Sequence, residues 1–348
     1  MSVGLTRRNL LRVGTVSALG LAGAVALQAQ SPVAAQDPTP TVPLAGHSGH
    51  SVGAMGIDMP GFMGEIDHTF NGFNPTDILT DFNYGDRVST LESGQTLREY
   101  DFIAGDKDVE VAPGIFYPAW TYNGRIPGPT IRCTEGDHLR INFLNGSAHP
   151  HTMHFHGIHP AGMDGVYEVI QPGETFVYEF DAEPFGVHEY HCHVMPLAKH
   201  IAKGLYGAFI IDPKQGWPNQ AGHELVMVMS GNDIDFDGVN DLYNVNFIPF
   251  HYDRHPIKVK VGALVRIFLV NMLEFDLINS FHLHANFFYW HPTGTNLTPS
   301  EYTDTIILGQ AQRGMLEFTY RYPGKYMFHA HVTEFAELGW TGVIEVEA

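Results

Sequence analysis

The chain has 348 residues, of which 44% are hydrophobic and 16% are charged, and it contains 22 prolines and 37 glycines. This composition excludes disordered and fibrous chains and fits one or two packed domains with many turns. The formal net charge of −19 argues against nucleic acid as a partner. It favours cationic small molecules, which an acidic surface attracts over long range, or neutral ones, which it does not repel.

The first 35 residues have the pattern of a cleaved export signal. Adjacent Arg7 and Arg8 precede the apolar run TVSALGLAGAVAL, and Val33-Ala34-Ala35 has the small-residue form of a signal peptidase site. Paired arginines before an apolar core favour the bacterial twin-arginine route, with an ordinary secretory signal or an uncleaved anchor as the alternatives. We expect a periplasmic or extracellular protein with no later membrane span and, after the loss of three arginines, a net charge of −22.

Residues 36–95 mix Pro, Gly, Ser, Thr and acidic residues with little hydrophobic periodicity, so we predict a flexible leader. Thioether and imidazole groups gathered in its segment 46–68 could recruit copper, although a flexible loop is the simpler interpretation. These side chains are His47, His50, Met55, Met59, Met63 and His68.

From residue 96 onward, short β-type runs alternate with turn signals, as in an antiparallel sandwich. The pattern occurs twice, because three segments of the first half have counterparts in the second half. They are TIRCTEGDHLRINFLNGS (130–147) with PIKVKVGALVRIFLVNML (256–273), HTMHFHG (151–157) with NSFHLHA (279–285), and GVHEYHCHV (186–194) with GKYMFHAHV (324–332). We predict an all-β chain of two tandem β-sandwich domains, at 96–215 and 216–348, joined near DPKQGWPNQAG at 212–222.

Each repeat carries two His-x-His pairs. On a strand, residues i and i+2 point to the same face, so each pair aims two imidazoles at one point. Eight imidazoles without a carboxylate or thiolate among them suit copper, zinc or iron. The eight are His154, His156, His191, His193, His282, His284, His329 and His331.

Two cysteines, Cys133 and Cys192, would by default form a disulfide in an exported protein. Cys192 lies between two histidines, however, which favours a role as a metal ligand. Cys133 lies in an alternating strand pattern and is interpreted as a small buried thiol. His151, Cys192 and His200 together supply the two nitrogens and one thiolate of a blue-copper electron-transfer site.

At these motifs the chain resembles the multicopper oxidases and the copper nitrite reductases, both built from cupredoxin-like Greek-key β-sandwich domains. The resemblance covers about 96–348 and rests on YNGRIPGPTIRCTEGDHLRINFLN, HTMHFHG, GMDGV and YHCHVMPLAKHIAKGLYG. It implies a type 1 copper bound by His151, Cys192 and His200, with Leu205 at a non-coordinating axial position. Without a thioether ligand, Cu(II) is disfavoured relative to Cu(I), so we expect a comparatively oxidising site.

For the eight paired histidines, the resemblance implies a trinuclear copper cluster. Together with type 1 copper, it gives about four coppers per chain. In two-domain members of the family the cluster forms between subunits of a homotrimer, and closure of both domains of one chain is the competing arrangement. His154 and His282 would bind type 2 copper, and the type 3 pair would be bound by His156, His191, His193, His284, His329 and His331.

The second repeat lacks the type 1 ligands. Asn279 stands where His151 stands, and Ala330 stands where Cys192 stands. The segment HVTEFAELGWTG is three residues shorter than HVMPLAKHIAKGLYG and has no counterpart of His200. We therefore expect type 1 copper in the first domain alone.

Two carboxylates resemble the acids that deliver protons in oxidases of this family. They are Asp164 in GMDGV and Glu334 in HAHVTE. Reduction of O₂ to water consumes protons, so acids placed near the cluster meet a chemical need. A turn-forming Asp before Gly and a solvated Glu are the alternatives.

Three functions remain open from the sequence. The resemblance first implies a laccase-type oxidase that couples oxidation of phenols, aryl amines or low-valent metal ions to reduction of O₂ to water. A copper nitrite reductase is the second, because Cys192 and His200 are eight residues apart, as in reductases. A reductase, however, uses Asp where this chain has His154, and its catalytic copper needs fewer imidazoles. A copper-storage or electron-carrier protein without turnover is the third.

Overall fold

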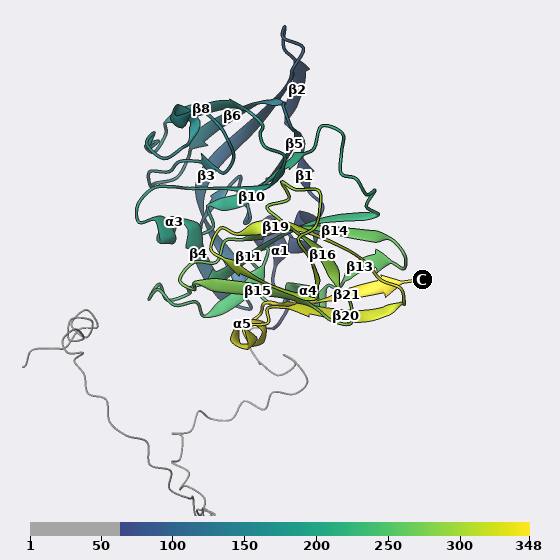
Figure 1. Ribbon diagram of the computed structural model, residues 1–348. Helices are drawn as coiled ribbons and strands as arrows, with labels where there is room; N and C mark the ends of the chain where they lie inside the picture. Colours follow the sequence, from purple (N-terminus) through teal and green to yellow (C-terminus); the bar gives the residue numbers. More distant parts are fainter. Residues whose placement is uncertain (1–62) are drawn as a thin grey trace, which may run out of the picture. The chain divides into compact units, whose positions relative to one another are not determined.

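The computed structural model describes residues 63–348, so the expected export signal and four side chains of the leader, His47, His50, Met55 and Met59, lie outside the described residues. Residues 63–348 contain an N-terminal segment (63–95) followed by two β-sandwich domains, domain 1 (96–215) and domain 2 (216–348) (Figure 1). Within this range, none of the helices has the length and apolar character needed to cross a membrane.

The N-terminal segment has defined structure. It contains α1 (His68–Asn71), α2 (Pro75–Ile78), β1 (Phe82–Asn83) and β2 (Arg87–Thr90). Asp67 and Asn74 cap the two helices by accepting backbone N–H hydrogen bonds, and Phe73, Ile78 and Leu79 are buried. The prediction of a flexible leader is therefore wrong for residues 63–95, because this segment buries apolar side chains and caps its own helix ends.

Domain 1 is a sandwich of two sheets. One sheet has the strand order β1-β5-β10-β9-β7, and the other has the order β2-β3-β6-β8 with β4 paired to β3. Along β6, alternate residues from Leu139 to Asn145 are buried, as expected for a strand with one face toward the core. The elements are β3 (Thr96–Ala112), β4 (Ile115–Tyr122), β5 (Thr130–Thr134), β6 (His138–Asn145), β7 (His154–Phe155), η2 (Ala161–Met163), β8 (Thr175–Asp181), β9 (Gly186–His191), α3 (Leu197–Ala202) and β10 (Tyr206–Asp212).

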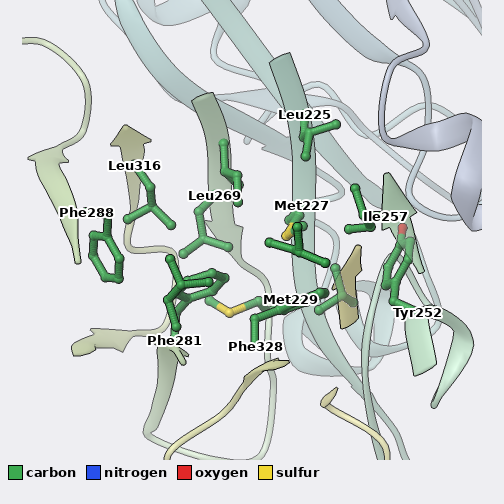
Figure 2. Close-up of a cluster of buried hydrophobic side chains, with 14 of the residues drawn as sticks. Leu225, Met227, Met229, Tyr252, Ile257, Leu269, Phe281, Phe288, Leu316 and Phe328 are labelled. Atoms are coloured by element: carbon green, nitrogen blue, oxygen red, sulfur yellow. The ribbon is translucent and has the colours of Figure 1, made fainter. Parts of the chain in front are cut away.

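Domain 2 repeats this plan with strand orders β12-β11-β14-β19-β16-β17 and β13-β21-β20-β15-β18. Aromatic and aliphatic side chains, including Phe281, Leu316 and Phe328, fill the space between its sheets (Figure 2). Its elements are β11 (His223–Asn232), β12 (Leu242–Val245), α4 (His251–Arg254), β13 (Ile257–Lys260), β14 (Leu264–Asn271), β15 (Ile278–Leu283), β16 (Phe288–Pro292), β17 (Glu301–Thr303), β18 (Thr305–Gly309), β19 (Arg313–Thr319), β20 (Gly324–His329), α5 (Thr333–Glu337) and β21 (Thr341–Glu347).

The sequence repeat is also a repeat of strand pairing. Parallel pairs β3/β6 and β5/β10 in domain 1 correspond to β11/β14 and β13/β21 in domain 2. The matching asparagines, Asn145 and Asn271, are both fully buried, and each side-chain amide donates to backbone carbonyls. The two domains therefore place equivalent sequence positions at equivalent points of the fold.

The two domains share a buried interface. Apolar side chains of domain 1, such as Val187 and Tyr206, pack with Val226 and Phe268 of domain 2 in one cluster that also includes Phe73. Beside it lies an ion-pair network, in which a carboxylate of domain 2 bridges one arginine from each domain. Its members are Arg132, Asp212, Glu224, Arg266 and Glu317. This buried interface holds the two domains in a fixed relation within a chain.

Candidate metal centres

The three residues of the expected type 1 site meet in the core of domain 1. His151 precedes β7, Cys192 follows β9, and His200 lies on α3. The Sγ of Cys192 is 3.7 Å from Nδ1 of His151 and 3.2 Å from Nδ1 of His200, and the two Nδ1 atoms are 3.3 Å apart. Two imidazole nitrogens and one thiol sulfur thus face a common point, the donor set of a blue-copper site.

Burial keeps these three donors neutral in the metal-free chain. It lowers the pKa of His151 to about 3 and that of His200 to about 4, with the neighbouring cationic groups adding to the effect. Burial also raises the pKa of the Cys192 thiol to about 11. Neutral imidazoles are ready to bind a metal, whereas the thiol ionises only when a cation replaces its proton. The residues therefore fit a bound copper ion.

The surroundings of this site include a buried leucine and a tryptophan that lines a nearby surface cleft. Leu205 is fully buried in the core cluster that contains Cys192, and its backbone oxygen accepts the Cys192 N–H at 3.0 Å. The ring of Trp120 lies 5.2 Å from that of His151 and 4.7 Å from that of His200. Trp120 also lines a surface cleft of about 500 Å³ together with His149. Neither His151 nor His200 lines this cleft, so Trp120 lies between it and the buried donor atoms.

Four histidines gather in each domain, and we call these groups half-site 1 and half-site 2. In half-site 1, the ring of His154 lies 4.9, 5.1 and 5.2 Å from the rings of its three partners. In half-site 2, the ring of His282 lies 4.9, 5.3 and 5.1 Å from its partners. Half-site 1 consists of His154, His156, His191 and His193, and half-site 2 consists of His282, His284, His329 and His331. Corresponding spacings differ by at most 0.2 Å, so the four imidazoles are arranged alike in the two domains.

Backbone carbonyls fix which ring nitrogen carries hydrogen. Nδ1 of His154 is 2.7 Å from the oxygen of Asp164, and Nδ1 of His191 is 3.1 Å from that of Cys192. In half-site 2, Nδ1 of His282 and of His329 also lie within 3.0 Å of carbonyl oxygens. A carbonyl only accepts, so each Nδ1 must donate. The Nε2 lone pairs are left free for metal ions, an arrangement typical of histidine ligands.

The two half-sites of one chain do not meet. In residues 63–348, close ring contacts join histidines inside half-site 1 and inside half-site 2, but no such contact joins the two groups. The groups of donor atoms that converge within 4.8 Å likewise belong to one domain each. Each chain therefore presents two separate four-imidazole surfaces, and the competing arrangement, closure within one chain, finds no support in these contacts.

A buried carboxylate that the sequence interpretation missed contacts half-site 1. Oε1 of Glu189 lies 3.2 Å from Nδ1 of His156, and Oε2 lies 3.0 Å from Nε of Arg313, a domain 2 residue. Glu189 is fully buried, and burial raises the pKa of its carboxyl to about 8 although Arg313 opposes the rise. Glu189 precedes His191 by two residues on β9, so the i, i+2 spacing was the available sequence signal.

The two expected proton carriers differ in position. Oδ1 of Asp164 lies 3.2 Å from Nδ1 of His154, and about a third (33%) of its side chain is exposed, so it contacts both half-site 1 and solvent. Glu334 is an exposed residue of α5, and its carboxylate makes no hydrogen bond within residues 63–348. The structure thus brings Asp164, but not Glu334, to a histidine of its own chain.

Domain 2 has other side chains at the positions that correspond to the type 1 ligands His151 and Cys192. Asn279 is fully buried and bonds to Asn271, and Ala330 stands at the place of Cys192. The N–H of Ala330 donates to the oxygen of Trp340 at 3.2 Å, as that of Cys192 donates to Leu205. Trp340 therefore stands at the backbone position equivalent to Leu205, and its indole ring is fully buried against Phe281 and Phe328. Cys133, by contrast, is a buried free thiol as predicted.

Comparisons with known proteins agree with this geometry. Family models described as multicopper oxidase match residues 105–216 and 223–348. A solved multicopper oxidase is 59% identical with a TM-score of 0.79, covering 81% of this chain and 100% of that one. A copper nitrite reductase structure from Nitrosomonas europaea is 30% identical with a TM-score of 0.66, covering 72% of this chain and 94% of that one.

Among curated proteins, the copper-containing nitrite reductase of Neisseria meningitidis is 27% identical over 249 residues, or 65% of this chain. The match spans 63% of that relative's length. These comparisons confirm the expected fold, two tandem cupredoxin-like β-sandwich domains, and support copper as the metal. With both domains matched by the same family and with a 59% identical oxidase among its relatives, the chain belongs to the multicopper oxidases.

Proposed function

We propose that this protein is a laccase-type oxidase. It couples one-electron oxidation of phenolic, aryl-amine or metal-ion donors to four-electron reduction of O₂ to water at a trinuclear copper cluster between subunits of a homotrimer. The observation that carries the proposal is the pair of matching half-sites, because eight imidazoles exceed what one copper ion can use. We also propose that the protein is exported, as its N-terminal sequence indicates.

The assembly follows from the half-sites. Each chain offers four imidazoles from domain 1 and four from domain 2 on separate surfaces. Half-site 1 of one chain joined to half-site 2 of the next makes a heterologous contact, which closes into a ring when the rotation permits. A trimer built in this way contains three complete clusters. About four coppers per chain then result, one of them in the type 1 site.

The residues of the chain have distinct tasks in this reaction. Copper ions, when bound, supply the one-electron chemistry at the type 1 site and the reduction of O₂ at the cluster. Cys192 links the two sites covalently, because its neighbours His191 and His193 belong to half-site 1. Asp164 is positioned to carry protons between solvent and His154. Glu334, which is exposed on α5, is proposed as a second proton carrier that acts at the assembled interface.

Nitrite reduction is the second candidate, since two similar proteins are described as copper nitrite reductases. Oxygen uptake with a phenolic donor and nitric oxide release from nitrite, measured on the same copper-loaded protein, separate the two activities. We expect rapid oxygen uptake without hydrogen peroxide, a near-ultraviolet type 3 band and a trimer in analytical ultracentrifugation. Nitric oxide release without oxygen uptake would replace the oxidase by a reductase. A blue protein with neither activity would be an electron carrier.

The proton carriers are tested by neutral substitutions. Asp164→Asn is expected to slow oxygen turnover while the copper content and the blue absorption band stay unchanged. Glu334→Gln is expected to have the same kind of effect only in the assembled trimer. If both variants turn over at the parent rate across the pH range, other groups must deliver the protons.

A further inference from the structure

Three histidines that belong to neither the type 1 site nor a half-site meet where the N-terminal segment packs on domain 2. His68 is the first residue of α1, His251 is the first residue of α4, and His255 follows α4. Both helices are labelled in Figure 1. One ring nitrogen of each lies within 4.8 Å of the others. We propose that these three imidazoles bind a divalent transition-metal ion, with Zn²⁺ or Cu²⁺ as the ions that suit them, and that this ion fastens the N-terminal segment to domain 2.

Local structure explains why the rings converge. His251 and His255 are four residues apart on a helical turn, so both rings project from one face, and their centroids are 4.6 Å apart. His68 is the first residue of α1, whose position is set by the Asp67 cap. Its ring lies 5.1 Å from that of His251 and 6.3 Å from that of His255. The cluster thus joins two elements that are far apart in sequence.

Three of the ring nitrogens are buried without a hydrogen-bond partner among residues 63–348. His251 is buried with 1% exposure, and its Nδ1 has no hydrogen-bond partner in residues 63–348, whereas its Nε2 lies 2.8 Å from Oγ1 of Thr76. Both ring nitrogens of His68 are also buried without a partner in that range. Buried polar atoms are normally hydrogen-bonded or bound to an ion. The contact of Thr76 with Nε2 would orient the ring and leave Nδ1 for a metal ion.

The donor chemistry selects the ion. Three neutral imidazoles suit Zn²⁺ and Cu²⁺ better than Ca²⁺ or Mg²⁺, which require oxygen ligands. A carboxylate is close at hand, because Oε2 of Glu65 lies 3.2 Å from Nε2 of His255. Glu65 and Asp67 offset the charge of the neighbouring Arg254. Glu65 can therefore complete the coordination or hold His255 in place.

The site lies on a segment that contacts both domains. Tyr252 of α4 donates to the oxygen of Pro75 at 2.8 Å, which ties the segment to domain 2. Asn71 at the end of α1 exchanges two hydrogen bonds with the backbone of Glu110 in domain 1, at 2.9 and 2.8 Å. An ion shared by α1 and α4 would hold this connection closed, because it binds the docked segment and not the detached one.

Zinc binding to the copper-loaded enzyme tests the proposal, since Zn²⁺ is redox-inactive. We titrate four proteins with Zn²⁺ by calorimetry and measure their copper contents before and after. They are the parent, His68→Ala, His255→Ala and, as the control, His223→Ala, which changes a histidine of β11. We expect one zinc per chain beyond the coppers. We expect the zinc affinity to fall at least tenfold in His68→Ala and His255→Ala and to stay unchanged in His223→Ala. Anomalous diffraction at the zinc edge should place the ion among the three rings.

A second measurement separates metal binding from folding. Hydrogen exchange of residues 63–79 should slow on addition of Zn²⁺ in the parent and in His223→Ala, but not in His68→Ala, with the blue absorption band confirming that each variant is folded. Absence of extra zinc, equal affinity in all four proteins, or zinc located elsewhere would overturn the proposal. These outcomes would not affect the oxidase assignment, because none of His68, His251 and His255 belongs to the type 1 site or to a half-site.

Discussion

Glu189→Gln is the substitution that tests most directly how half-site 1 is prepared. The carboxylate of Glu189 is fully buried between Nδ1 of His156 and the guanidinium of Arg313. Glutamine keeps the shape and can still accept a hydrogen bond, but it carries no charge. The change therefore removes the charge assistance that orients His156 toward a metal ion and leaves the packing intact.

The size of the effect follows from the contacts. A hydrogen bond to a charged group contributes about 1.5–3 kcal/mol, and a neutral one about 0.5–1.5 kcal/mol. Exchange of a charged bond for a neutral one therefore costs about 1–1.5 kcal/mol, which at about 1.4 kcal/mol per factor of ten lowers copper affinity roughly 5- to 12-fold. Since burial raises the pKa of Glu189 to about 8, the loss of affinity should be largest above pH 8 and should nearly vanish at pH 6, where the carboxyl of the parent is also neutral.

The assay is equilibrium competition for copper between the protein and a chelator, at pH 6 and pH 9, followed by oxygen uptake of the refilled enzyme. Glu317→Gln is the matched control, because Glu317 is a buried carboxylate paired with Arg266 in the same interface but touches no half-site histidine. The control should lose stability and keep its copper affinity. An equal copper affinity of Glu189→Gln and the parent at pH 9 would refute the reasoning.

Three further substitutions have defined outcomes. Leu205→Met should lower the reduction potential of the type 1 site, because a thioether favours Cu(II), and a redox titration that gives an unchanged or higher potential would contradict the axial assignment. Glu224→Ala should cost about 1.5–3 kcal/mol in urea unfolding, since it removes the carboxylate shared by Arg132 and Arg266 while each arginine keeps one other carboxylate, and a loss below about 1 kcal/mol would show that the network contributes little. Burial raises the pKa of Glu274 to about 7, so the native chain binds more protons than the unfolded chain between about pH 4.5 and 7, and stability falls as pH rises through that window. Because the group is partly exposed, we expect Glu274→Gln to remove about 1–2 kcal/mol of this fall, and thermal unfolding of the copper-free variant at pH 5 and pH 8 should show a flatter profile than the parent.

Most of the fold and the histidine pairs could be predicted from the sequence, because strand geometry acts over two residues. The His-x-His spacing predicts that His154 and His156 lie together, as do His282 and His284, and these rings are 4.9 Å apart in both domains. The prediction that both members lie on a strand is wrong, because the second histidine of each pair follows the end of β7 or β15. The turn-rich segment 212–222 also lies between two strands, since β10 ends at Asp212 and β11 begins at His223.

The features that the sequence did not disclose depend on contacts between distant segments. Arg313 meets Glu189 across 124 positions, and nothing local to either residue indicates the pair. The helices of the N-terminal segment have four residues each, too few for hydrophobic periodicity, and only the caps Asp67 and Asn74 marked them. His68 and His251 likewise come together through tertiary packing alone.

Trp340 makes a second type 1 site in domain 2 difficult to engineer. A histidine at Asn279 and a cysteine at Ala330 would supply two donors, but the fully buried indole would still stand at the backbone position equivalent to Leu205, and the shortened loop would still lack the third donor. Each single substitution would therefore disturb a packed core without completing the donor set. A designed copy of the first centre in this domain thus needs a longer loop as well as new donor side chains.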